Sequence, residues 1–292
     1  MRIILSIVAL LLITPAHAFD IGIGGFSMGG SSDKASKRFN QAKQLFKVAS
    51  ALIPISDEEE RILGKKVAAQ VIARYGIENS PEMTYYLNLM ATAIAQRSDR
   101  PDIPYHVAIL DTDDVNAYAC PGGFIFLTRG VLNTVGDEAE LAAVLAHEIS
   151  HVTERHIVNA LRNSKLMKVG TEMAAEAFRT PGPLLDQMTS FATDALFNGL
   201  NKSDEYASDA KAIEYLNRLG YDYPAMFDVL ELLDARRKQG SAEVLSKTHP
   251  SPQTRIQELK SEVKKLSLDK PTGIRLPNRF ATHAPKQQKN AS

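Results

Sequence analysis

Apolar residues recur at helical spacing over much of the chain. A capping box at Ser56 and Glu59, a stop at Gly76 and a Pro at position 81 mark where two of these segments begin and end. Helices are expected over five ranges: 34–51, 56–76, 81–94, 224–238 and 252–266. The first three segments carry no chemistry of their own, so we expect them to form the walls of a domain, which the last two close.

The pattern changes after Pro104, where short apolar runs have the composition of strands. One covers 107–110 and another 124–128, and the turn residues Pro121-Gly122-Gly123 precede the second. We read them as a small antiparallel sheet. The chain is therefore expected to be mainly α-helical with a small antiparallel β-sheet, an α+β fold.

The two ends of the chain differ from this pattern. Arg2, an apolar run over 3–13 and Ala16-His17-Ala18 predict a secretory signal peptide over 1–18, cleaved between Ala18 and Phe19. An uncleaved membrane anchor is the alternative. A Gly-rich flexible leader is expected over 19–33 and a disordered tail over 267–292. The folded domain is expected over 34–266, exported most simply to the periplasm.

Composition and charge exclude some classes of partner and of covalent cross-link. The formal net charge is zero and the charges are interspersed, which argues against a nucleic-acid partner. Cys120 is the single cysteine, so no intrachain disulfide can form. A cysteine can serve as a nucleophile or a ligand, but the apolar surroundings of Cys120 in the sequence favour a buried, inert thiol.

One helix carries residues suited to metal chemistry. Asp137 matches a helix start, and His147 and His151 follow four residues apart among apolar positions. This spacing puts both imidazoles on one face, where they can share a metal ion. Glu148 projects about 100° round the helix and can reach a metal-bound water without being a ligand. This is the H-E-x-x-H arrangement of zinc peptidases.

His156 follows this motif closely in the sequence. It lies nine residues after His147, which is about 180° round a continuous helix. We therefore expect His156 to face away from the metal and to be a surface or packing residue.

A catalytic zinc needs a third protein ligand and one open position. Glu205 and Asp209 lie four residues apart and so share a helix face. We expect Glu205 to bind the metal while Asp209 accepts the ring N–H of a ligand histidine and fixes its tautomer. The alternative is an ordinary solvated acidic face.

A last polar cluster contains His249 and Arg255. His249 is a candidate oxyanion donor, with Arg255 either helping it or pairing with a helix carboxylate. His249 could instead be a fourth zinc ligand that holds an enzyme latent, or part of a Pro-rich turn that caps the next helix.

The segment over 166–200 links the two metal-binding helices and is broken at Thr180-Pro-Gly-Pro183. We interpret it as a packed helix hairpin. A mobile lid and a peripheral contact with a membrane surface are the alternatives.

These motifs occur together and in order, and the chain resembles a family of gluzincin endopeptidases. The family includes HtpX, LoiP, BepA, the mitochondrial OMA protease and the CAAX prenyl protease. The resemblance rests on four motifs: Asn116-Ala-Tyr-Ala-x-Pro-Gly-Gly123, Glu140-Leu-Ala-x-Val-x-x-His-Glu-x-x-His151, Glu205-x-x-x-Asp209 and Thr248-His-Pro250 with Arg255-Ile256. It covers about 56–259 and implies a zincin-like metalloprotease domain. From this sequence we expect neither the multi-span helices of HtpX-like members nor the tetratricopeptide array of BepA-like members.

The resemblance also implies a mechanism. One Zn²⁺ per chain is expected on His147, His151 and Glu205, with Glu148 as catalytic acid and base. An edge strand is expected to hold extended substrate by β-augmentation, although a purely structural hairpin is the alternative. The candidate substrate-binding residues are Asn116, Ala117, Tyr118, Gly122 and Gly123.

The expected function is that of a zinc endopeptidase of the cell envelope. Its substrates would be unfolded or misassembled envelope proteins, as similar periplasmic members take part in outer-membrane protein quality control. A periplasmic chaperone or assembly factor with a latent metal site is the alternative from another class.

Overall fold

The computed structural model describes residues 55–164, 176–180, 182–239, 249–266, 268 and 273–284. The expected signal peptide, the leader over 19–33 and the helix over 34–51 lie outside these residues. So do Thr248 and, within the linking segment, residues 166–175 and 181.

A three-stranded sheet lies at the centre of the described residues, in the order β1-β3-β2. The strands are β1 (His106–Leu110), β2 (Ala117–Cys120) and β3 (Phe124–Thr128). β2 and β3 pair antiparallel across the short 3₁₀ turn η1 (Pro121–Gly123), whereas β1 and β3 pair parallel. The expected mainly helical α+β fold is confirmed, but the sheet is mixed. The reason is that the segment before the turn is itself a strand and takes the antiparallel place beside β3.

The strands alternate between two apolar layers, as their period of two requires. Ile125 and Leu127 of β3 belong to one buried cluster, which includes side chains of α3 (Pro81–Ala95) and α5 (Glu138–Thr153). Phe126, one position away, belongs to a second cluster with side chains of α2 (Asp57–Tyr75) and α8 (Pro183–Asn198). The sheet is therefore covered on both faces by helices.

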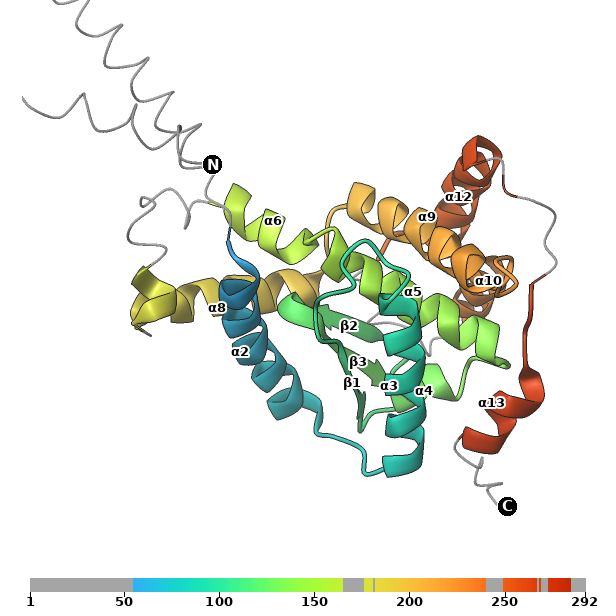
Figure 1. Ribbon diagram of the computed structural model, residues 1–292, viewed down its shortest axis with the longest axis horizontal. Helices are drawn as coiled ribbons and strands as arrows, with labels where there is room; N and C mark the ends of the chain where they lie inside the picture. The colour runs from blue at the N-terminus through green and yellow to red at the C-terminus, as the bar shows by residue number, and fades with distance from the viewer. Residues whose placement is uncertain are drawn as a thin grey trace, which may run out of the picture. The chain divides into compact units, whose positions relative to one another are not determined.

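The helix α5 is almost completely buried. It packs against α3, α9 (Lys202–Leu219) and α10 (Ala225–Lys238), and α12 (Pro252–Leu266) packs against α9 and α10. Figure 1 shows α5 running between the sheet and the helices α9, α10 and α12. Two shorter helices, α4 (Arg129–Leu132) and α6 (His156–Asn163), flank it in sequence. The capping box at Ser56 and Glu59 and the helix pair over 224–238 and 252–266 match the sequence-based expectation.

Part of the expected disordered tail is built into the fold. Residues 273–284 include α13 (Pro277–His283), whose Phe280 is buried in the core cluster of α5. Arg279 pairs with the buried Glu138, and Arg275 pairs with Asp137 and three further carboxylates, Glu140, Asp222 and Asp228. The expectation of disorder does not hold here, because the basic residues that suggested it have acidic partners far away in the sequence.

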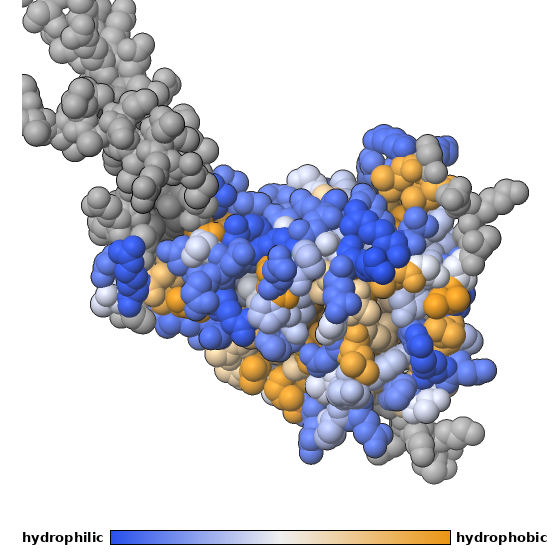
Figure 2. Space-filling model, viewed as in Figure 1, coloured by the Kyte–Doolittle hydropathy of each residue, from blue (hydrophilic) through white to orange (hydrophobic). Residues whose placement is uncertain are grey.

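The face of the molecule drawn in Figure 2 is mostly polar, with scattered apolar areas. Ile72, Ile77 and Leu89 are among the exposed apolar side chains. Exposed apolar side chains of this kind are normal on a protein surface in water. Within the described part of the chain, no helix combines the length and apolar character needed to cross a membrane.

Candidate metal centre

The helix α5 positions the two histidines of the motif. Asp137 caps its N-terminus by accepting a hydrogen bond from the Glu140 amide at 2.9 Å. Packing on several sides buries nearly the whole helix, so its polar residues must find partners inside the protein. The Nε2 atoms of His147 and His151 lie 3.1 Å apart, as the spacing of one helical turn predicts.

Glu205 joins this pair from α9, which packs along α5. Its carboxylate oxygens lie 3.6 Å from the Nε2 atoms of His147 and His151. A tetrahedral zinc with ligand distances of about 2.0–2.1 Å sets its donor atoms about 3.3 Å apart. The donor atoms present, two imidazole nitrogens and one carboxylate, therefore fit such an ion in both chemistry and spacing.

Asp209 and Arg255 support the first histidine from behind. Asp209 Oδ1 lies 2.9 Å from Nδ1 of His147, and the Arg255 guanidinium binds both Asp209 oxygens at 2.5 and 2.8 Å. Burial acts to raise the pKa of Asp209, but Arg255 and His147 outweigh it and lower that pKa. A charged Asp209 keeps the Nδ1 proton on His147 and leaves its Nε2 free to bind metal. Asp209 is therefore where the sequence-based reading expects it, and Arg255 pairs with a helix carboxylate.

His249 approaches Glu205 from the segment before α12. Its Nδ1 donates a hydrogen bond to Glu205 Oε2, and donor atoms of His147, Glu205 and His249 all lie within 4.8 Å of one another. Burial acts to raise the pKa of Glu205, but His249 and His147 hold it well below its usual range. The structure thus brings the imidazole of His249 to the ligand group as a candidate fourth metal ligand.

The two motif histidines differ in their basicity. Burial lowers the pKa of His151 well below its usual value. Burial also acts to lower the pKa of His147, but its hydrogen bonds with Asp209 and Glu205 raise it to about 9. Because a metal binds the neutral ring, a cation that enters this site releases a proton near neutral pH.

Glu148 lies beside the ligand group and faces a cavity. Its carboxyl is buried, and burial raises its pKa, with the neighbouring His147 acting in the opposite direction. A carboxylate with a raised pKa is a stronger base than an ordinary carboxylate and can still release the proton again. The position and basicity of Glu148 therefore suit a general base.

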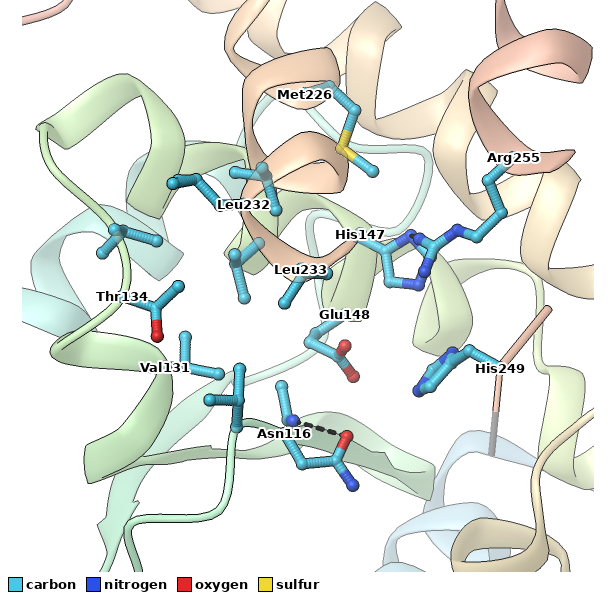
Figure 3. A pocket seen from close by; sticks show the side chains of 15 residues that line it. Asn116, Val131, Thr134, His147, Glu148, Met226, Leu232, Leu233, His249 and Arg255 are labelled. Atoms are coloured by element: carbon cyan, nitrogen blue, oxygen red, sulfur yellow. Dashed lines mark hydrogen bonds between the residues drawn. The ribbon is translucent and has the colours of Figure 1, made fainter. Parts of the chain in front are cut away.

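Two cavities meet at Glu148. One has a volume of about 530 Å³ and an apolar far wall that includes Val131, Met226, Leu232 and Leu233; the other has about 340 Å³ and is lined in part by Leu196 and Leu200. Figure 3 shows the side chains that line the first cavity, with His147 and His249 on the right, Glu148 and Asn116 near the middle, and Val131 and Leu232 towards the left. Glu148, His249, Asn116 and Ala117 line both cavities, so the two form one path along β2.

The expected substrate-binding residues divide into two groups. Asn116 and Ala117 line both cavities and Tyr118 lines the smaller one. Gly122 and Gly123 do not reach either cavity. Both are buried in the η1 turn at φ 71° and 92°, where a Cβ would lie 2.7 Å from Arg61 Cα or 2.6 Å from Pro104 O. These glycines permit the turn between β2 and β3 and are not part of the site.

The apolar wall of the larger cavity was not anticipated from the sequence. Met226, Val229 and Leu233 recur at spacings of three and four along α10. This spacing indicates a buried helix face, but it does not show that the face borders a cavity.

His156 is placed differently from the expectation. It is buried, and its Nδ1 lies 2.9 Å from Nδ1 of His151. The expectation that it faces away from the metal ligands is wrong, because α5 ends at Thr153 and the chain turns through a left-handed residue, Arg155, with φ 56° and ψ 37°. The angle predicted from a continuous helix does not apply beyond such a turn.

Cys120 has no part in the ligand group. It is fully buried at the end of β2, and burial raises the pKa of its thiol. This agrees with the expected inert thiol.

Comparisons with known proteins agree with this geometry. The sequence model of the family described as "Peptidase family M48" matches residues 81–263. The chain is 29% identical to the beta-barrel assembly-enhancing protease of Escherichia coli O157:H7, over 74% of this chain and 46% of that protein. It is 25% identical to the mitochondrial metalloendopeptidase OMA1 of Schizosaccharomyces pombe, over 70% of this chain and 61% of that protein. The chain thus spans about half the length of the first of these relatives.

Proposed function

This chain belongs to peptidase family M48, and on that premise we propose that it is a zinc-dependent endopeptidase of the cell envelope. The observation that carries the proposal is the placement of the buried Glu148 beside His147, His151 and Glu205, at the point where two cavities meet. His147, His151 and Glu205 would hold the zinc. When bound, the ion would supply a Lewis acid that makes a water acidic and polarises a peptide carbonyl.

The chain's own residues supply the proton transfers. Glu148, with its raised pKa, takes a proton from the attacking water and passes it to the leaving amine. Asp209 and Arg255 hold His147 in one tautomer throughout, because both are buried and paired with each other. Burial of these groups keeps bulk water from weakening their interactions.

The substrate is proposed to be an extended polypeptide. β2 lies at an edge of the sheet, and its first residue, Ala117, lines both cavities, so a peptide can add to it as a further strand. The larger, aliphatic cavity would receive an apolar side chain next to the scissile bond. Asn116 Nδ2 is buried and has no hydrogen-bond partner within the described part of the chain, so it is available to donate to a substrate carbonyl.

The proposed cellular location and biological role rest on the named relatives and on the predicted signal peptide. Several relatives are named beta-barrel assembly-enhancing proteases. With the predicted signal peptide over 1–18, this supports export to the periplasm and a role in outer-membrane protein quality control. Unfolded or misassembled envelope proteins are the proposed substrates, since an extended strand site accepts chains that lack their own fold.

A second candidate is a chaperone or assembly factor whose metal site is latent. The contact between His249 and Glu205 favours it, because a fourth donor beside the ligands can close the position that a substrate needs. A protein held in this state would bind unfolded chains along β2 without cleaving them.

The test compares the purified protein with its Glu148→Gln variant, a substitution that preserves size and removes the base. We expect the wild type to cleave an unfolded substrate such as casein. The variant is expected to bind one zinc per chain and to lose at least about 100-fold in rate, within the range typical of a lost general base. Retained cleavage by the variant would overturn the mechanism, and a wild type that binds zinc but cleaves nothing would favour the chaperone.

A further inference from the structure

We infer that His156 is a positioning residue for the metal site, which accepts a hydrogen bond from the ring of His151 and so fixes that ring for metal binding. The inference rests on the proposed zinc site and adds to it a residue from a separate helix. The two Nδ1 atoms lie 2.9 Å apart, and the rings meet edge to face at 73° with centroids 5.0 Å apart.

The direction of this hydrogen bond follows from the position of the other ring nitrogen. His151 Nε2 lies among the proposed ligand atoms, 3.1 Å from His147 Nε2 and 3.6 Å from Glu205. To bind a metal it must carry no proton, so the proton of the neutral ring lies on Nδ1. His151 Nδ1 is then the donor and His156 Nδ1 the acceptor. His156 is held as the tautomer protonated on Nε2.

His156 does for His151 what Asp209 does for His147. In each case the ring nitrogen that faces away from the ligand group meets an acceptor, at 2.9 Å from Nδ1. The acceptors differ in charge, because Asp209 is a carboxylate paired with Arg255 and His156 is an imidazole. A ligand histidine without such a partner rotates more freely and loses metal affinity.

The fold brings His156 to this place through a specific turn. Arg155 adopts the left-handed conformation, which a non-glycine residue takes only where its surroundings hold it. Its guanidinium donates to the buried Glu60 and to the carbonyl of Ile55, which anchors the turn to the start of α2. The turn begins α6 with His156 directed back at α5.

His156 also lies close to the second metal-binding helix. Its Nδ1 is 3.5 Å from Oγ of Ser208, a fully buried residue of α9 three positions after Glu205. His156 therefore occupies the space between the helix that carries the histidines and the helix that carries the carboxylate ligand. Removal of the His156 ring is therefore expected to lower the zinc affinity more than the stability of the metal-free protein.

The test replaces His156 with two residues that differ in one property. Asn places an acceptor oxygen near the position of Nδ1, whereas Leu fills similar space and has no acceptor. His106→Leu is the matched control. His106 is exposed and lies on β1, at the edge of the sheet opposite β2, so the substitution removes an imidazole far from the proposed site. The zinc dissociation constant of each purified protein is measured by competition with a fluorescent chelator. Urea unfolding of each metal-free protein is measured beside it.

We expect His156→Leu to weaken zinc binding about 10–100-fold, the usual cost of losing an outer hydrogen-bond partner. His156→Asn is expected to stay within about threefold of the wild type, and His106→Leu to match it. Equal zinc affinity of the Leu and Asn variants would overturn the inference. A wild type that binds no zinc would overturn the proposed function itself.

A second measurement needs no variant and so does not depend on whether the Leu variant folds. Nitrogen NMR of the histidine rings in the zinc-loaded wild type reports which ring nitrogen carries each proton. We expect a proton on Nδ1 of His151 and none on Nδ1 of His156. A proton on Nδ1 of His156 would overturn the inference, because that nitrogen could not then accept from His151.

Discussion

Nδ1 of His249 donates a hydrogen bond to Oε2 of Glu205, the carboxylate that also faces both motif histidines. Because the His249 N–H is directed at the metal-ligand carboxylate of Glu205, it is not directed at a substrate carbonyl. Removing the ring would instead free the fourth position beside the metal ligands. We therefore expect His249→Ala to raise the basal cleavage of unfolded casein on the order of 10-fold, about 1.4 kcal/mol in activation free energy. Rates are compared per bound zinc. A fall in rate at full zinc occupancy would instead make His249 an oxyanion donor.

The unpartnered amide of Asn116 gives a second prediction. Asn116→Asp keeps the oxygen that accepts from the Ala117 amide at 3.0 Å and removes the donor Nδ2. We expect kcat/KM for a peptide substrate to fall about 10–100-fold, because one hydrogen bond to the reacting group is lost. Zinc content is expected to stay the same.

Asn88→Ala is the matched control for Asn116. The Asn88 amide is fully engaged with β1, donating to the Val107 carbonyl and accepting from its amide. Its loss is expected to lower the free energy of unfolding and to leave kcat/KM unchanged in the protein that remains folded. Unchanged kcat/KM in Asn116→Asp would show that Asn116 serves only the backbone turn.

The aliphatic cavity predicts a side-chain preference. Leu233→Trp is expected to fill part of the cavity of about 530 Å³ and to shift cleavage from large apolar residues towards Ala. Each buried methylene that no longer fits is worth about 0.8 kcal/mol, so the preference for Leu over Ala should fall about tenfold or more. Cleavage of a peptide library, read by mass spectrometry, measures this ratio. The exposed Leu89→Trp is the control, and an equal shift there would contradict the assignment.

The carboxylate of Glu138 predicts how stability depends on pH. Burial acts to raise its pKa, but Arg279, Tyr221 and Tyr86 outweigh it and lower the pKa below its usual value. A group with a lowered folded-state pKa contributes stability that is complete above its unfolded pKa, about 4.5, and is lost as pH falls through the folded value. We expect Glu138→Gln to destabilise the protein by about 1–3 kcal/mol at pH 7. Its stability should also fall less between pH 5 and pH 3 than that of the wild type.

Urea unfolding at several pH values checks this prediction. Glu214→Gln is a suitable control, because Glu214 is a partly exposed partner of Lys211 and Arg218 on α9. Equal slopes of stability against pH for Glu138→Gln and the wild type would contradict the assignment.

The sequence predicts those parts of the site that depend on local geometry. His147 and His151 share a helix face because four residues make one turn, and Glu205 and Asp209 repeat the same relation on α9. The position of His156 could not be predicted, since it depends on one left-handed residue that Glu60 anchors from α2. Helical periodicity holds only within a helix.

Pairings between segments that are far apart in the sequence could not be predicted either. The parallel pairing of β1 and β3 depends on where the chain between them runs, which alternation within a strand does not specify. Arg275 and Arg279 lie in a stretch with the composition of a disordered tail, and their partners on α5 lie more than 130 positions earlier. Composition describes a segment alone, whereas these ion pairs depend on the folded whole.

The same ion pairs affect the order in which the protein can fold during its synthesis. Synthesis runs from the N-terminus, so α5 leaves the ribosome long before the arginines that neutralise Asp137, Glu138 and Glu140. Until then the first turn of the histidine-bearing helix carries buried carboxylates without their cationic partners, which opposes its docking. The helix that would hold the metal therefore reaches its full stability only after Arg275 and Arg279 have been synthesised.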